Sequence, residues 1–219
     1  AFYTQWLLNI KDSQNEDGSV PDVVPHHKYP IVGTPAWQVA YPLLVWYMYN
    51  YFGDERIVSQ HFESLEKYMK YMASISEEYI IRQGRGDWVP PRLAYRPSDG
   101  SVPITSTGYY FESARIMTQL AEILDNDTKQ QEYQSLANNI KEAFNNEFLD
   151  RSKFSYGSGS QNSNAFALYT GIVPEDIANR VADNLSEQIL IKDKGLLTVG
   201  ILGTKALVQV LPKYDMDEV

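Results

Sequence analysis

The sequence contains no cysteine, and this absence excludes two kinds of site at once. Without thiols the chain can form neither disulfides nor thiolate metal sites. It has only three histidines, His26, His27 and His61, which are too few and too unevenly spaced for a histidine-rich metal site. We therefore predict no metal in this chain.

Basic clusters and long apolar runs are scarce as well. The formal net charge is −9, and no stripe of lysine and arginine suited to phosphate is present, so we expect no nucleic-acid partner. No apolar run reaches membrane-spanning length, and no signal peptide opens the chain. Phosphate loops, dinucleotide fingerprints and the Gly-x-Ser-x-Gly elbow are also missing. We expect no cofactor and no membrane partner, and the sequence assigns no compartment.

Hydrophobic residues recur with the helical period along most of the chain. The pattern predicts a helix with a proline kink at Pro42, helices capped by Asp54 and Asp127, and no strand. The expected helices cover residues 2–12, 35–52, 55–74, 105–124, 128–148, 165–169, 174–189 and 198–211.

One-sided helices alternate along the chain with helices that are apolar on nearly every face. This alternation predicts an all-α fold in which buried helices form an inner ring and one-sided helices an outer ring. Twelve helices would close such an (α/α)6 barrel, and about eight are expected here, so residues 1–219 are predicted to form one incomplete barrel domain. An ordinary helical bundle is the alternative, but it does not need such strict alternation or such long loops.

The long expected loops, 14–34, 75–104 and 149–160, all lead from an outer helix to an inner one. They should therefore gather at one end of the barrel, where function usually lies. Asp87 and Trp88 occupy the longest loop, and a carboxylate beside an indole suits a sugar, which offers hydroxyls and a C–H face. The competing interpretation is a capped turn with a tryptophan in the core.

Two further residues are expected at the same end. Trp37 falls in the first turn of an inner helix, where it could contact a sugar or simply pack in the core. Asp22 belongs to the rigid loop from Asp17 to Pro25, where a turn role competes with a role as a sugar ligand.

Several segments occur in an order that resembles a known family. They are Phe2-Tyr3 with Trp6-Leu7, the loop Asp17 to Pro25, Gly33 to Trp37, Tyr51 to Asp54, Gly86-Asp87-Trp88 and Leu197 to Thr204. This order resembles the six-hairpin catalytic domain of bacterial α-L-rhamnosidases, glycoside hydrolase family 78, and the resemblance extends over essentially the whole chain.

The resemblance implies an (α/α)6 barrel that cleaves terminal α-L-rhamnose with inversion. It places Trp37 and Trp88 at the positions of pocket tryptophans, with Asp87 beside the second. The family's general acid lies upstream of this chain and its general base downstream, so no catalytic residue is expected within the chain. The family commonly has Trp-x-Asp-Ala at the first pocket tryptophan, whereas this sequence has Trp37-Gln38-Val39-Ala40.

The sequence therefore predicts a segment of an α-L-rhamnosidase-like glycosidase, inactive alone, with a rhamnoside as its partner. The substrate-binding candidates are Trp37, Asp87, Trp88 and Asp22. A non-catalytic carbohydrate-binding or scaffold module of the same fold is an alternative, as is another six-hairpin sugar hydrolase. The apolar flanks of an open ring predict self-association or further domains of a longer chain.

Overall fold

The computed structural model describes residues 2–25, 34–91, 101–216 and 219. His26, His27 and parts of the two longest expected loops lie outside these residues. The chain divides into two compact units: residues 1–84 with 109–140, and residues 85–108 with 141–219. Helices α5 (Ser101–Ile123) and α6 (Asp127–Phe148) contribute residues to both units.

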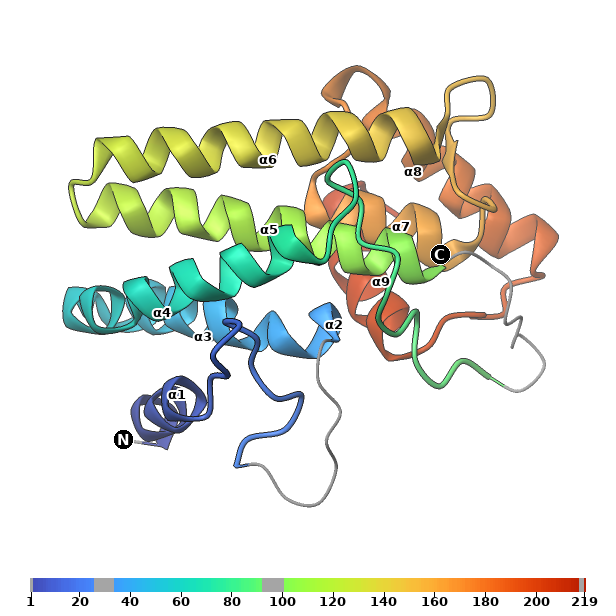
Figure 1. Ribbon diagram of the computed structural model, residues 1–219. Coiled ribbons are helices and arrows are strands. Elements are labelled where there is room, and N and C mark those ends of the chain that lie inside the picture. The colour runs from blue at the N-terminus through green and yellow to red at the C-terminus, as the bar shows by residue number, and fades with distance from the viewer. Residues whose placement is uncertain (1, 26–33, 92–100, 217–218) are drawn as a thin grey trace. The chain divides into compact units, whose positions relative to one another are not determined.

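The first unit begins with α1 (Phe2–Asp12), followed by α2 (Pro35–Gln38), α3 (Ala40–Phe52) and α4 (Glu55–Ser74). Helix α1 packs against α3 and α4, and α3 and α4 lie side by side as a hairpin (Figure 1). Asp54 caps α4 as predicted, because its carboxylate accepts a hydrogen bond from the Arg56 N–H. Gly53 ends α3 in a left-handed conformation, which allows the tight two-residue connection.

The helix expected over residues 35–52 is divided in two at Val39. Pro42 lies three residues further on and has no N–H to donate to the Gln38 carbonyl. The disturbance predicted from Pro42 therefore appears one turn before the proline, as a break between α2 and α3.

Two further expectations from the sequence need correction. Asp127 is the first residue of α6, and the cap is Asn126, whose side-chain oxygen accepts a hydrogen bond from the Lys129 N–H. The chain also contains two short antiparallel strands, β1 (Leu149–Asp150) and β2 (Ser155–Tyr156). Their turn is stabilised locally, because the Asp150 carboxylate accepts hydrogen bonds from the Ser152 and Lys153 N–H groups.

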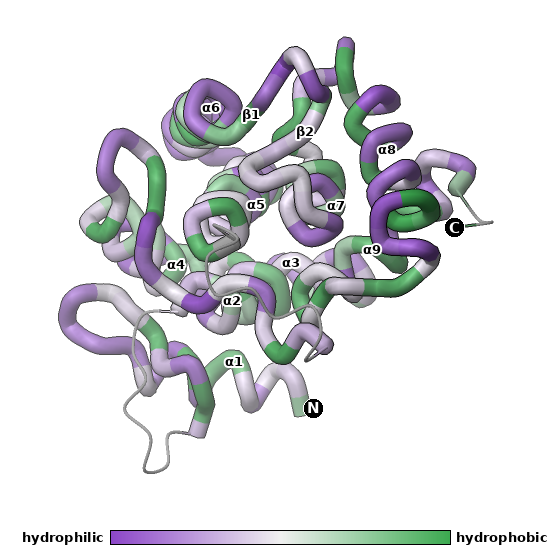
Figure 2. The backbone as a smooth tube through the Cα atoms, turned by 90° about the vertical axis from the view of Figure 1, so that its right-hand side faces the viewer, coloured by the Kyte–Doolittle hydropathy of each residue, from purple (hydrophilic) through white to green (hydrophobic). Residues whose placement is uncertain are grey.

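The second unit is centred on α7 (Gln161–Thr170), which packs against α8 (Ala178–Glu187) and α9 (Ile201–Lys213). A 3₁₀ turn (Glu175–Ile177) precedes α8 and a π-helical turn (Gln188–Lys192) follows it. Helix α7 is buried along almost its whole length. Hydrophobic residues are interspersed among hydrophilic ones along α8, as Figure 2 shows. The buried residues of α8 lie on one face and are Val181, Ala182 and Leu185.

The structure confirms the all-α class, and from α4 to α8 one-sided and buried helices alternate along the chain. Helix α3 departs from the expected burial on nearly every face, since Tyr51 and Phe52 near its end are 79% and 70% exposed. Helix α9 departs from the expectation of burial on every side, since Ile201 and Val208 are 58% and 67% exposed. Among the described helices, none combines the length and the apolar character needed to cross a membrane.

Candidate functional site

The loop from Asp17 to Pro25 is held against α4 in the first unit. Gln14 donates hydrogen bonds to the Gly18 and Ser64 carbonyls, at 2.8 and 2.9 Å. Gly18 has φ +90°, and a Cβ atom there would lie 2.2 Å from the Lys67 carbonyl oxygen. Only glycine allows the two backbones to approach so closely.

Asp17 stabilises the turn of this loop. Its carboxylate accepts hydrogen bonds from the N–H and the hydroxyl of Ser19, which lower the pKa of Asp17. The same loop is fixed at its far end by Trp6, whose indole N–H donates to the Val24 carbonyl at 2.9 Å. The loop is therefore tied to both α1 and α4.

Asp22 and Trp37 are connected through the start of α2. The Asp22 carboxylate accepts a hydrogen bond of 3.2 Å from the N–H of Thr34, the residue that precedes α2. Gln38 is buried, and its amide donates a 2.7 Å hydrogen bond to the Val20 carbonyl. Trp37 is half-buried between these two attachments. The loop and the first turn of the inner helix therefore form one assembly in the first unit.

Asp87 is held in the second unit by the start of α9. Its carboxylate accepts hydrogen bonds from three backbone N–H groups, those of Gly200, Leu202 and Gly203, the last two at 3.0 Å. These groups are the donors that a helix leaves unpaired at its first turn, and a negative charge is favoured there. We call this arrangement the Asp87 clamp. Asp87 therefore acts as a cap, as the capped-turn interpretation predicted. The N–H groups that it caps lie more than a hundred residues further along the chain.

The two glycines of the clamp are required by this close approach. A Cβ atom on Gly200 would lie 2.2 Å from the Trp88 carbonyl oxygen and 2.9 Å from Oδ1 of Asp87. A Cβ atom on Gly203 would lie 2.7 Å from Oδ2 of Asp87. The Asp87 clamp is therefore formed by two segments, residues 86–88 and residues 199–203.

Trp88 is fixed beside the clamp without being buried. Its carbonyl accepts a 2.8 Å hydrogen bond from the Ile201 N–H, and the Arg85 guanidinium lies 4.5 Å from its ring centroid. The side chain is 41% exposed within this chain, so it does not fill the core of the second unit. An exposed indole on a fixed backbone is suited to contact a sugar ring.

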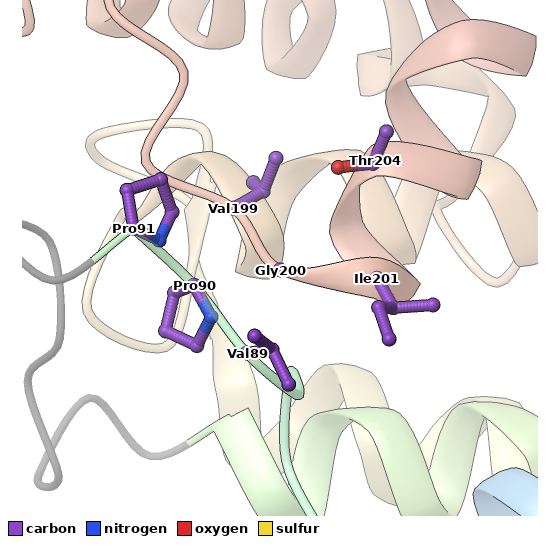
Figure 3. A pocket seen from close by; sticks show the side chains of 7 residues that line it. All are labelled: Val89, Pro90, Pro91, Val199, Gly200, Ile201 and Thr204. Carbon is purple, nitrogen blue, oxygen red and sulfur yellow. The ribbon is translucent and has the colours of Figure 1, made fainter.

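A cleft of about 520 Å³ opens beside Trp88, within the second unit. Figure 3 shows residues 89–91 running past the start of α9, with side chains from both segments around the opening. Its lining residues are Val89, Pro90, Pro91, Val199, Gly200, Ile201 and Thr204.

Strongly displaced pKa values occur in the core of the first unit and do not mark a catalytic group. The Tyr41 hydroxyl lies 2.8 Å from Nδ1 of His61, and both side chains are 1% exposed. Burial lowers the pKa of His61 to about 4 and raises that of Tyr41 to about 12. Side chains so deeply enclosed cannot reach a substrate, so these shifts report packing.

The structure thus places the four predicted residues as two pairs, Asp22 with Trp37 and Asp87 with Trp88, each within its own unit. Sequence reasoning did not single out Gly200, Gly203 or the cleft residues. The sequence did contain one signal for the clamp, because Gly200 and Gly203 lie three residues apart at the start of a helix. Glycines so placed indicate that another segment approaches the backbone closely.

The helices, among them the α3–α4 hairpin, and the loops at the starts of α2 and α9 define an all-α domain of helical hairpins. The profile of the bacterial α-L-rhamnosidase six-hairpin glycosidase domain matches residues 1–219, and the chain belongs to this family.

Relatives and solved structures agree with this membership. An α-L-rhamnosidase of Formosa agariphila is 26% identical over 96% of this chain and 23% of its own length. The structure of α-L-rhamnosidase from Dictyoglumus thermophilum superposes with a TM-score of 0.92 at 35% identity, over 99% of this chain and 25% of that one. The Streptomyces avermitilis α-L-rhamnosidase complexed with L-rhamnose gives a TM-score of 0.86 at 26% identity, over 98% and 20%. The chain therefore spans between a fifth and a quarter of these proteins.

Proposed function

We propose that the protein carrying this chain hydrolyses terminal α-L-rhamnosides, and that this chain supplies part of its substrate-binding site. The observation that carries the proposal is the family match over the whole chain, supported by the high structural similarity to α-L-rhamnosidases. In this proposal Trp37 and Trp88 are each sugar contacts, one in each unit. Asp22 and Asp87 hold the segments that carry the two tryptophans, and Asp22 also offers oxygens to sugar hydroxyls.

The bond-breaking groups are assigned to other parts of the protein. Inversion needs a general acid on the leaving oxygen and a second carboxylate, roughly 6.5–9.5 Å away, to activate water. Asp87 is unsuited to either role, because both of its oxygens already accept backbone hydrogen bonds. The chain alone is therefore expected to bind rhamnose without hydrolysing it.

The test is an assay of the full-length protein on an aryl α-L-rhamnoside, beside other aryl glycosides as controls. We expect turnover of the rhamnoside. Trp37→Ala and Trp88→Ala should each raise KM at least about tenfold, because buried aromatic contacts dominate binding energy. Trp46→Ala is the control: Trp46 stacks on Tyr49 and is not a candidate sugar contact. Cleavage of other glycosides but not of the rhamnoside would refute the substrate assignment.

A non-catalytic carbohydrate-binding module is the second candidate, and Val39 favours it. Val39 is buried at the position where the family commonly has an aspartate, so this chain lacks that carboxylate. A titration with rhamnose, monitored by tryptophan fluorescence, distinguishes the binding module from the glycosidase when it is combined with the hydrolysis assay. Binding without hydrolysis by the full-length protein supports the module. Binding that persists in both Trp37→Ala and Trp88→Ala would place the sugar elsewhere.

A further inference from the structure

We propose that Arg85 is a positioning residue for Trp88, because its guanidinium holds the indole in the orientation that receives the sugar. The guanidinium lies over the indole ring, 4.5 Å from the ring centroid. It therefore covers one face of the ring, and a sugar must use the other. The inference rests on the proposed function, since it takes Trp88 as a sugar contact.

The side chain of Trp88 gains from such support because the Asp87 clamp fixes only the backbone beside it. The Trp88 carbonyl accepts a hydrogen bond from the Ile201 N–H, but a backbone hydrogen bond does not set a side-chain rotamer. The indole is 41% exposed. A side chain that becomes ordered only when its ligand arrives loses conformational entropy, which weakens binding. A contact that orders the indole beforehand therefore strengthens the binding of the sugar.

The charge of Arg85 is not used in an ion pair. Arg56, Arg115 and Arg151 each lie 2.9–3.5 Å from a carboxylate oxygen, whereas no carboxylate of the described residues pairs with Arg85. The sequence has 28 acidic and 19 basic residues, so a shortage of partners does not explain this. The carboxylate of Asp87, two residues away, already accepts hydrogen bonds from three backbone N–H groups. The group that the Arg85 charge does contact is the indole.

The backbone that carries Arg85 is held on both sides. The Arg85 carbonyl accepts a hydrogen bond of 3.4 Å from the hydroxyl of Thr105, which is fully buried in the second unit. Two residues further on, the Asp87 carboxylate is bound to the start of α9. Arg85 itself is half-buried, and a guanidinium partly removed from water is attracted to an indole more strongly than one in bulk solvent. Arg85 is therefore a brace that stands on a fixed backbone.

The experiment measures KM and kcat of the full-length protein on methylumbelliferyl α-L-rhamnoside. Arg85→Gln removes the charge and should raise KM by roughly three- to tenfold, which corresponds to the strength of a cation–π contact. The value of kcat should not change, because Arg85 acts on binding and does not touch the reacting atoms. Arg85→Lys keeps a positive charge but loses the planar guanidinium, so its KM should lie between those of the unmodified protein and Arg85→Gln.

A double-mutant cycle between Arg85 and Trp88 tests whether the arginine acts through the indole. If it does, Arg85→Gln should have no further effect on KM in a protein that already carries Trp88→Ala. A purely structural role would not produce this dependence. An equal increase of KM in both backgrounds would show that Arg85 acts without Trp88 and would overturn the proposal.

Arg180→Gln is the matched control, because the Arg180 guanidinium lies 3.5 Å from the ring centroid of Phe154, which is not a candidate sugar contact, in the same unit. Its KM should equal that of the unmodified protein. If the rhamnoside is cleaved but Arg85→Gln and Arg180→Gln have the same KM, Arg85 does not position Trp88, and the rhamnosidase proposal stands. A lower thermal unfolding midpoint of Arg85→Gln with an unchanged KM leads to the same conclusion. If the rhamnoside is not cleaved, the proposed function is wrong and this inference falls with it.

Discussion

Removal of the Asp87 carboxylate should release the start of α9, and Asp87→Ala tests this directly. The substitution leaves the N–H groups of Gly200, Leu202 and Gly203 without their acceptor, and both glycines are buried. Loss of a helix cap costs about 0.5–2 kcal/mol, and an unsatisfied buried donor costs a further 1–3 kcal/mol or so. We expect the free energy of unfolding to fall by about 3 kcal/mol.

The assay is urea unfolding of the chain, followed by tryptophan fluorescence and by far-ultraviolet circular dichroism. Asp150→Ala is the matched control. Asp150 also accepts hydrogen bonds from two backbone N–H groups, but it does so within its own turn at the surface. Water can replace those contacts, so Asp150→Ala should lower the free energy of unfolding by about 1 kcal/mol or less.

The conservative variant adds a second measurement. Asp87→Asn keeps the shape of the side chain but turns an NH₂ group toward a backbone donor and removes the negative charge at the helix start. The free energy of unfolding of Asp87→Asn should lie between those of the unmodified chain and of Asp87→Ala. If Asp87→Ala is no less stable than Asp150→Ala, the carboxylate does not hold α9, and the argument is refuted.

Two other perturbations have clear expected results. Gly18→Ala should cost roughly 3 kcal/mol or more, because its Cβ would collide with the Lys67 carbonyl, whereas Gly53→Ala has open space and should cost only about 1 kcal/mol. Similar unfolding midpoints for these two variants would contradict this. Burial lowers the pKa of His61 from 6.5 to about 4, so the unfolded chain takes up the proton first as the pH falls. Stability should be full above pH 6.5 and decline toward pH 4 by on the order of 2–3 kcal/mol, and this part of the slope should vanish in His61→Gln.

Local patterns predicted the helices where one signal dominated. Helix α4 occupies the expected residues, because Asp54 marks its start and a single apolar stripe runs along it. The start of α7 was missed, because Gln161 and its neighbours are polar yet buried. Gln161 pairs with the side chain of Asp193 and with the backbone of Leu196 and Thr198. These partners lie more than thirty residues away, so no local rule could place them inside the fold.

The candidate site shows the same limit. The sequence allowed two interpretations of Asp87 and Trp88: either both contact a sugar, or they form a capped turn with the tryptophan in the core. In the structure the two residues differ: the Asp87 carboxylate caps α9, and the Trp88 side chain remains exposed. The deciding contact joins Asp87 to Gly203, and a sequence without an alignment gives no way to pair them.

This division of roles bears on where catalysis can occur. A general acid or base must exchange protons with the substrate during turnover, so its oxygens must be available for that step. The Asp87 oxygens accept hydrogen bonds from the first turn of α9, and withdrawing them would loosen the same helix that positions the Trp88 carbonyl. A carboxylate that maintains the site in this way is poorly suited to react in it. The clamp therefore gives a physical reason, independent of family resemblance, to exclude Asp87 from the reacting carboxylates.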